Sequence, residues 1–247
     1  GSYFAKSYKN EYDVLASTTS EIREDLRANK IAQCPYVLGT SIPEEVLQFN
    51  PDLILISVPP SKIAKGVVDF SRSLTEIESK LSVKQLCFIS STGVYENTGK
   101  HNEESKNLKG GTLLELERAL LRFTVPKVVL RMGGLYNQSD RHPANWFKNK
   151  DEIMDGYANL VDQQDAAAAI RHCFSKGLTG TYNVCHPEIT TKSQVYPAAF
   201  ADGGSNCPRI IPTKDLGKEI LVDKILETGF RFEHSSAASV FISTKKG

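Results

Sequence analysis

The chain has 247 residues, of which 40% are hydrophobic and 24% charged, and its formal net charge is +1 at pH 7. These values describe an ordinary globular protein with room for one large domain, or for a domain and a smaller lobe. The charge is nearly balanced and no basic block stands out, so we expect no nucleic-acid partner. No apolar run approaches the roughly 20 residues that a membrane-spanning helix requires, so we expect no membrane partner either.

The five cysteines are scattered, odd in number and without a C-x-x-C pair. Two of them, Cys87 and Cys185, lie inside apolar runs and are expected to be small core residues. This usage indicates a reducing compartment, here the cytoplasm, and argues against structural zinc. No cluster of His, Cys and Asp has metal-ligand spacing, so no metal site is predicted.

Short apolar runs alternate with helical patterns along the chain. A helix is expected at the start, around Phe4, Ala5 and Tyr8. The elements that follow are expected at 12–16 (strand), 36–38 (short strand), 43–49 (helix), 52–58 (strand), 61–81 (helix), 86–90 (strand), 112–123 (helix), 127–131 (strand), 165–174 (helix with Asp165 as N-cap) and 181–185 (strand). This alternation predicts an α/β fold with a doubly wound parallel sheet and helices on both faces.

Two strands of this sheet end in segments that suit a binding site. The strand at 86–90 ends at Ser90, the first of three successive hydroxyls, those of Ser90, Ser91 and Thr92. The segment SVPPS, at 57–61, follows the strand at 52–58. Ligands of open parallel sheets bind at the carboxyl ends of the strands, so we expect both segments to border a ligand.

The first residues have two interpretations. In a dinucleotide-binding unit, the first helix follows a strand and a glycine-rich turn, and Gly1 stands where the last glycine of a G-x-x-G-x-x-G turn would stand. Gly1 and Ser2 are either a cloning remnant or the point at which the sequence starts inside that motif. The second interpretation, which we favour, predicts a native chain that is longer at its N-terminus. It also predicts unpaired backbone in the middle of the sheet, where the first strand belongs.

Five segments, in order, resemble motifs of the extended short-chain dehydrogenase/reductase superfamily, the NAD(P)-dependent epimerase/dehydratase group. They are GSYFAKSY (1–8), FISSTGVY (88–95), VVLRMGGLYN (128–137), NLVDQQDAAAAI (159–170) and GTYNVCHPE (180–188). The resemblance covers nearly the whole chain and implies a Rossmann-like sheet with a small C-terminal substrate lobe. It implies an NAD(P)-binding domain of residues 1–136 and 157–186, and a lobe of residues 137–156 and 187–247.

The chain departs from this family at the catalytic pair. Typical members carry a Y-x-x-x-K pair on the helix after the serine strand, in which the lysine lowers the pKa of the tyrosine that acts as acid and base. Here Lys109 aligns with the tyrosine and Leu113 with the lysine, and residues 96–125 contain no tyrosine. The chain therefore resembles atypical members that lack this dyad.

The resemblance places Ser91 where typical members hydrogen-bond the reacting substrate oxygen, and our catalytic candidates are Ser91, Thr92 and Tyr95. The alternative for the two hydroxyls is that they cap a strand-to-loop turn. The alternative for Tyr95 is a core ring whose hydroxyl is hydrogen-bonded. Tyr136 and His142 are candidate substrate contacts, with packing and a surface position as their alternatives.

The expected cofactor is NADP, with NAD as the alternative. No carboxylate directly follows the second strand, where NAD binders place an Asp or Glu on the ribose. Hydroxyls and the nearby Arg23 suit a 2′-phosphate, although a small register shift would bring Glu21 to the ribose. The expected cofactor contacts are Gly1, Ser17, Thr18, Thr19, Ser20, Arg23, Ser57, Val58, Pro59 and Ser90.

Two functions are open. The first is an NAD(P)-dependent oxidoreductase or epimerase that acts on a small-molecule carbonyl or alcohol, with a nucleotide sugar suggested by the fold alone. The second is an NAD(P)-binding sensor or partner-binding protein without turnover, which the absent dyad favours. A homodimer is an open option for the assembly.

Overall fold

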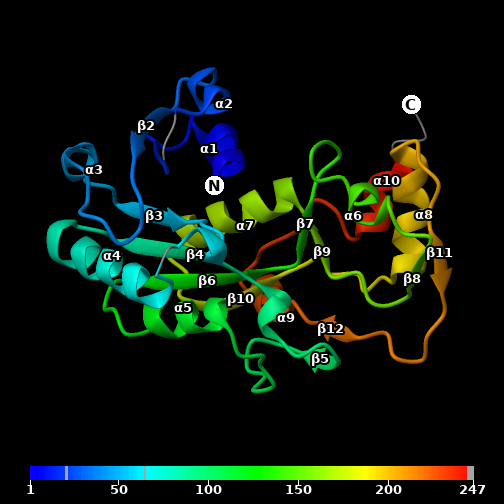
Figure 1. Ribbon diagram of the computed structural model, residues 1–247. Helices are drawn as coiled ribbons and strands as arrows, with labels where there is room; N and C mark the ends of the chain where they lie inside the picture. Colours follow the sequence, from blue (N-terminus) through cyan, green and yellow to red (C-terminus); the bar gives the residue numbers. More distant parts are fainter. Residues whose placement is uncertain (20–21, 64, 244–247) are drawn as a thin grey trace. The chain divides into compact units, whose positions relative to one another are not determined.

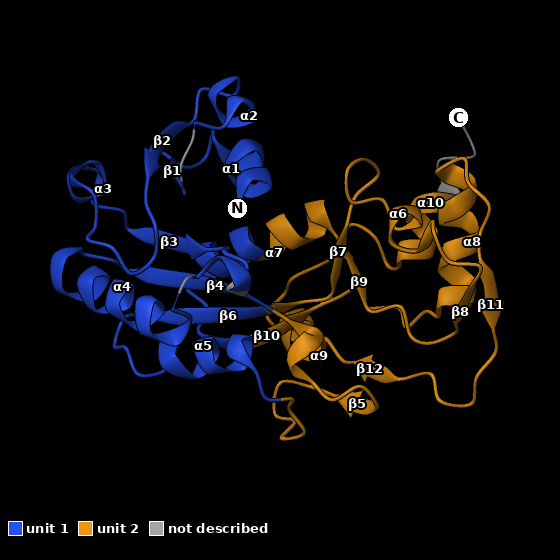
Figure 2. Ribbon diagram, in the orientation of Figure 1, with its two compact units in different colours: residues 1–90, 110–130, 170–180 blue, residues 91–109, 131–169, 181–247 orange. Residues whose placement is uncertain are grey.

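The computed structural model describes residues 1–19, 22–63 and 65–243 (Figure 1). Ser20 and Glu21, which belong to the expected cofactor region, lie outside the described residues. The chain forms two compact units (Figure 2), which are unit 1 (residues 1–90, 110–130 and 170–180) and unit 2 (residues 91–109, 131–169 and 181–247). The division into a cofactor domain and a substrate lobe at the boundaries expected from the sequence stays a prediction.

The α/β class with a parallel sheet is confirmed. Strand β1 (Leu15–Thr18) pairs in parallel with β2 (Ala32–Pro35), and β3 (Leu53–Ile56) pairs in parallel with β4 (Gln85–Ser91). A four-stranded sheet has the order β10-β6-β4-β3, where β6 is Lys127–Met132 and β10 is Gly180–Val184. The two-stranded sheet of β1 and β2 is separate from it.

Helices cover both faces of the sheet in unit 1. On one face, α4 (Val67–Lys80) and α5 (Thr112–Leu120) pack Phe70, Leu74, Leu116 and Leu120 against Ile56, Leu86, Phe88 and Val129 of the strands. On the other face lies the end of α7 (Gln163–Lys176), and just after this helix the Leu178 carbonyl accepts the Gln85 amide at 2.6 Å. Successive residues of a strand point to opposite faces, so the apolar run of β4 contributes side chains to the packing on both faces of the sheet.

The N-terminal part of unit 1 packs on the same side as α7. Helix α1 (Ser2–Tyr8) places the Phe4 ring 6.1 Å from that of Phe174. The Arg171 guanidinium forms an ion pair with Glu11 at 2.6 Å. The remaining elements of the unit are α2 (Glu24–Arg27), α3 (Glu44–Phe49) and the short 3-10 helix η1 (Pro60–Lys62).

Unit 2 consists of short parallel strand pairs and helices around a second core. The pairs are β7 (Gly134–Tyr136) with β9 (Leu160–Asp162), β8 (Glu152–Met154) with β11 (Arg209–Ile211), and β5 (Gly99–His101) with β12 (Lys218–Ile220). The helical segments are η2 (Thr92–Val94), α6 (Ala144–Phe147), α8 (Lys192–Asp202), α9 (Asp223–Glu227) and α10 (Ala237–Ser243). The core includes Tyr136, Val195, Phe200 and Phe241.

One glycine of unit 2 is required by close approach. A Cβ at Gly133 would lie 2.6 Å from the Asn159 carbonyl oxygen and 2.8 Å from the Cys185 sulfur. Glycine therefore lets the segment after β6 pass close to the backbone that precedes β9. Cys185 is buried, as are Cys34, Cys87 and Cys173, which confirms the core positions expected for Cys87 and Cys185.

Three expectations about local structure were wrong. Strand β1 begins at Leu15 rather than at residue 12, so Ser17 and Thr18 belong to the strand instead of the loop after it. The second strand is Ala32–Pro35, and residues 36–38 lie outside it, because β2 is half exposed and carries no apolar run. Asp165 is not the cap of α7, which begins at Gln163; the Asp162 carboxylate instead accepts the Gln164 N–H at 2.6 Å.

Candidate functional site

A cavity of about 330 Å³ in unit 1 gathers much of the expected cofactor site. Of the expected contacts, it is lined by Gly1, Ser17, Thr19, Arg23, Ser57 and Val58. They come from the start of α1, the carboxyl ends of β1 and β3, and the start of α2. Thr18, Pro59 and Ser90 are not part of this lining, and Ser20 lies outside the described residues.

Three polar contacts lie at or beside the rim of this cavity. The Gly1 amino group donates to the Ser57 hydroxyl at 3.0 Å, which joins the start of α1 to the end of β3. At the start of α2, the Arg23 guanidinium binds both carboxylate oxygens of Asp25, at 3.0 and 2.9 Å. The Lys6 ammonium lies 3.2 Å from the same carboxylate. A 2′-phosphate at Arg23 would therefore compete with Asp25.

Ser90 is engaged inside the sheet. Its hydroxyl donates to the Glu117 carboxylate of α5, and both side chains are buried. This hydrogen bond joins the end of β4 to α5, so in this structure the Ser90 hydroxyl has a structural partner inside unit 1.

The turn after β4 holds the three catalytic candidates. The Ser91 hydroxyl accepts the Gly93 N–H at 3.0 Å, which caps η2 and leaves the hydroxyl its own proton to donate. Thr92 is buried, and its carbonyl accepts the Lys218 ammonium at 2.7 Å. The roles expected for Ser91 and Thr92 stay predictions.

Tyr95 is fully buried at the centre of a polar network in unit 2. Its hydroxyl donates to the Asn183 side-chain oxygen at 2.8 Å and accepts from the Arg131 guanidinium at 2.9 Å. Its ring stacks on that of His101, with ring centres 5.0 Å apart. Burial raises the pKa of Tyr95, although Arg131 acts in the opposite direction, so the phenol stays protonated at neutral pH.

Lys218 also contacts the turn after β4, and it was not selected from the sequence. Its pKa is below the ordinary value for a lysine. Burial lowers its pKa, and the positive charge of Lys109 lowers it further. Its position is fixed because the Asn159 side chain donates to the Lys218 carbonyl at 2.8 Å and accepts the Ile220 N–H at 3.1 Å. The segment LGKEI gives no signal of this role, since the contact that identifies Lys218 is made to a backbone carbonyl.

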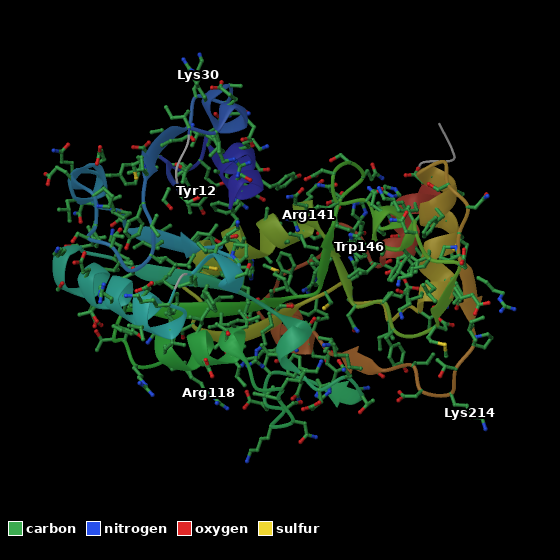
Figure 3. The ribbon with its side chains drawn as sticks, in the orientation of Figure 1. Tyr12, Lys30, Arg118, Arg141, Trp146 and Lys214 are labelled. Atoms are coloured by element: carbon green, nitrogen blue, oxygen red, sulfur yellow. The ribbon has the colours of Figure 1, made fainter. Side chains whose placement is uncertain are left out.

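The two candidate substrate residues are both deep in unit 2. Tyr136 is fully buried, and its hydroxyl lies 2.9 Å from the His186 Nε2. His142 is 6% exposed, so its alternative as a surface histidine was wrong. One of its ring nitrogens lies 3.2 Å from the Asp202 carboxylate and the other accepts the Ala144 N–H. By contrast, Trp146 on α6 is 39% exposed (Figure 3).

The described residues contain no group of three or more His, Cys, Asp or Glu side chains placed to hold a metal ion. In the same part of the chain, no helix has the length and apolar character needed to cross a membrane.

Comparisons with solved structures give consistent matches over the whole chain. The Bordetella bronchiseptica enzyme WbmG, in complex with NAD and UDP, matches with a TM-score of 0.74 at 14% identity, over 99% of this chain and 92% of that one. A UDP-glucuronic acid 4-epimerase from Bacillus cereus, in complex with NAD, gives 0.75 at 12% identity, over 100% and 96%. A UDP-glucose 4-epimerase from Thermotoga maritima, with UDP-glucose, gives 0.72 at 17% identity, over 100% and 95%.

The chain has the Rossmann-type fold of these solved structures. Identities of this size establish the fold alone, and they confirm at that level the resemblance drawn from the sequence motifs. No family profile matches the sequence, and no curated protein matches it either. The three solved neighbours contain NAD, UDP or UDP-glucose, and these ligands are properties of those proteins.

Proposed function

We propose that this protein binds a nicotinamide dinucleotide and catalyses oxidation and reduction at a hydroxyl or carbonyl carbon of a small-molecule substrate. The observation that carries the proposal is the convergence of six expected cofactor residues on one cavity of unit 1. The fold neighbours make a nucleotide sugar the first substrate class to test. A cytoplasmic location, expected from the cysteine usage, is part of the same proposal.

The residues at the rim fit a dinucleotide in part. Ser17, Thr19 and Ser57 supply hydroxyl donors, and Arg23 supplies a cation. We keep NADP as the first choice because of Arg23, and NAD as the second because two neighbours are described with NAD. When bound, the nicotinamide would accept or supply the hydride.

Lys218 is our candidate for the proton transfer that the absent tyrosine performs in typical members. During oxidation of an alcohol, its neutral amine would take the hydroxyl proton while the C–H hydride leaves, and the ammonium would return that proton on reduction. Ser91 would hold the same substrate oxygen through its hydroxyl proton. A lysine whose pKa is lowered toward neutrality is suited to this work, since acid–base catalysis is most efficient near the operating pH.

A binding protein without turnover is the second candidate, and specific contacts favour it. The Tyr95 hydroxyl is bonded to both Asn183 and Arg131, and the Ser91 oxygen already caps a turn. A sensor of this kind would bind the dinucleotide without a proton donor at the substrate oxygen.

Fluorescence titration with NADPH and NADH, followed by a turnover assay on UDP-glucose, tests the two candidates. We expect saturable binding that weakens in Arg23→Ala and Ser57→Ala. The matched control is Arg118→Ala on the outer side of α5 (Figure 3), which should bind as the parent does. Binding with conversion of UDP-glucose to an epimer supports the enzyme, and binding without turnover on UDP-glucose or a panel of carbonyl compounds supports the sensor. Absence of binding to either nucleotide overturns both candidates.

Asp25→Asn should increase the preference for NADPH over NADH by about 2- to 5-fold. The substitution removes the carboxylate that occupies the Arg23 guanidinium, and an exposed ion pair of this type is worth about 0.2–1 kcal/mol. The ratio of the two dissociation constants, measured at low and high salt, checks it. Asp52→Asn, which breaks the exposed pair with Lys84, is the control and should leave the ratio unchanged. An unchanged ratio in Asp25→Asn would show that Arg23 does not meet a 2′-phosphate.

Lys218→Met and Lys218→Arg should both lower kcat by about 10²- to 10⁴-fold and leave nucleotide binding intact. Arginine keeps the charge beside the Thr92 carbonyl but does not release a proton near neutral pH, so it cannot act as a base. For oxidation of the alcohol, in which the neutral amine is the base, the fall of kcat on the acidic side of the pH profile should disappear in both variants. Lys100→Met, which removes another lysine of unit 2, is the control. Recovery of activity in the arginine variant would show that Lys218 only holds the turn.

A further inference from the structure

A loop of unit 1 beside the proposed cofactor cavity is held in place by side chains of α4. The loop covers residues 36–42, directly after β2, and it contains no helix or strand. Four of its residues, Tyr36, Val37, Leu38 and Ile42, line the cavity. The position of this part of the cavity wall therefore depends on the groups to which the loop is bonded.

Three side chains of α4 bind the backbone of this loop. The Ser73 hydroxyl accepts the Gly39 N–H at 2.7 Å, and the Arg72 guanidinium donates to the Gly39 carbonyl at 3.0 Å. The Glu76 carboxylate accepts the Ile42 N–H at 2.8 Å, and this hydrogen bond lowers the pKa of Glu76. The middle and the end of the loop are thus hydrogen-bonded to the same helix.

These side chains belong to one polar stripe of α4. The stripe consists of Asp69, Arg72, Ser73 and Glu76, which occupy positions i, i+3, i+4 and i+7 and therefore lie on one face of the helix. Asp69 lies against Gly39, where a Cβ would be 2.4 Å from the Asp69 carboxyl carbon, and the φ of Gly39 is +95°. Glycine is therefore required where the loop meets the stripe.

The stripe also lies close to a side chain of the cavity wall. Tyr36 lines the cavity, and burial raises the pKa of its hydroxyl. Ser73 acts on this pKa in the opposite direction, and the charge of Glu76 raises it further, so the Tyr36 hydroxyl lies beside the stripe. The Tyr36 side chain therefore connects the cavity wall with α4.

The loop differs from the strands of the cavity wall in how it is held. Strands β1 and β3 also line the cavity, and each is hydrogen-bonded to a neighbouring strand. The loop has a turn in which the Thr40 N–H donates to the Val37 carbonyl at 3.1 Å, and the stripe supplies the bonds of Gly39 and Ile42. Side-chain hydrogen bonds of this kind can break while the sheet stays folded, so this wall can loosen by itself.

We propose that Arg72, Ser73 and Glu76 are positioning residues of the cofactor cavity, which hold the loop 36–42 against a bound nicotinamide dinucleotide. The inference rests on the proposed function, because it takes the dinucleotide as the ligand. In the described part of unit 1, none of the three side chains belongs to the lining of the cavity, so their effect passes through the loop. A looser wall releases a bound ligand more easily, so the effect falls on the dissociation rate.

The test uses three variants of the stripe in the full chain. Ser73→Ala and Glu76→Ala remove the acceptors of the loop N–H groups, while Glu76→Gln keeps an oxygen that can accept the Ile42 N–H. Stopped-flow fluorescence follows release of the nucleotide that the parent binds more tightly, NADPH or NADH. We expect release to be about 3- to 10-fold faster in the two alanine variants and within about 2-fold of the parent in Glu76→Gln. Hydrogen exchange of the Gly39 and Ile42 amides, measured without nucleotide, should be at least about 5-fold faster in the corresponding alanine variant.

Two controls on α4 are matched to these variants. Thr75→Ala changes a residue outside the stripe, whose hydroxyl donates to the Ser71 carbonyl of the same helix. Lys80→Met removes the ion pair of Glu76 and leaves its contact with the loop in place. Both controls should keep the release rate and the exchange rates of the parent, and all variants are compared below their Tm.

The outcomes separate this inference from the proposed function. If the parent binds a nucleotide and the alanine variants release it at the parent rate, the inference is overturned and the proposed function is unaffected. Equal exchange in the parent and the alanine variants also overturns the inference, and so does fast release in Glu76→Gln. A parent that binds neither nucleotide overturns the proposed function, and with it the ligand named here, whatever the exchange rates show.

Discussion

Replacing Tyr95 with alanine is expected to lower the free energy of unfolding by about 3–5 kcal/mol, the range for large aromatic side chains removed from a core. The ring is fully buried, stacks on His101, and lies 4.9 Å from the Arg131 guanidinium carbon. Its hydroxyl also joins Arg131 to Asn183. Alanine therefore removes packing and hydrogen bonds at the same position.

Tyr95→Phe separates these two contributions. It keeps the ring and removes one hydrogen-bond partner each from Arg131 and Asn183, so we expect a loss of about 1–3 kcal/mol. Chemical denaturation of both variants measures the two values. If the alanine variant loses no more than the phenylalanine variant, the ring does not carry the stability that its burial implies.

The same pair of variants tests the catalytic role expected for Tyr95. A purely structural tyrosine gives a phenylalanine variant with nearly normal kcat below its unfolding temperature. A tyrosine that transfers a proton gives a loss of about 10²- to 10⁴-fold in kcat with only the modest loss of stability. The raised pKa of Tyr95 favours the first outcome, because a phenol far above neutral pH is a poor base.

A second large effect is expected from pH, through His186. Burial lowers the pKa of His186 from 6.5 to about 4, and its Nδ1 donates to the His234 carbonyl at 3.0 Å. Between these two pKa values the unfolded chain binds a proton that the folded chain excludes. The contribution to stability is therefore complete above pH 6.5 and is lost progressively as the pH falls toward 4, by about 3 kcal/mol in all.

Other titratable groups lie close to His186, and they also change the stability of the fold with pH. The Asp165 carboxylate lies 3.8 Å from its Nδ1, and burial raises the pKa of Asp165, so this group stabilises the fold as the pH falls. The charge of His234 opposes protonation of His186, while the Tyr136 hydroxyl faces its Nε2 and stays protonated. The dependence on pH is thus the sum of opposing titrations.

His186→Gln isolates the histidine contribution, because glutamine is polar but does not titrate. The unfolding free energies of the parent and of His186→Gln are measured from pH 7 to pH 4. Over this range the parent should lose about 3 kcal/mol more than the variant. Identical slopes for the parent and His186→Gln would show that His186 titrates at its ordinary pKa.

The sheet and most of its helices could be predicted because their sequences repeat with a clear period. Apolar runs such as those of β4 and β6 are long enough to identify buried strands, and α4 and α5 have an apolar stripe. The first two strands were misplaced for the opposite reason. Both β1 and β2 are half exposed, and their polar residues give no period that distinguishes strand from loop.

Only those residues of the candidate site that lie at the carboxyl ends of strands could be predicted from the sequence. Parallel strands bring their carboxyl ends to one edge, which is why Ser17 and Ser57, far apart in sequence, line one cavity. The partners of those side chains depend on tertiary packing. Nothing in the sequence couples Ser90 to Glu117, Tyr95 to Asn183, or Lys218 to the Thr92 carbonyl, since each contact joins elements that meet only in the folded chain.

Asn159 has a consequence for how position 218 can vary. Its amide binds the carbonyl of Lys218 and the N–H of Ile220, as the main chain of a neighbouring strand would. These two bonds recognise peptide groups and are indifferent to the side chains attached to them. Strand β12 therefore keeps this anchorage when the side chain at position 218 is changed, and what such a change removes is the contact of the lysine ammonium with the Thr92 carbonyl.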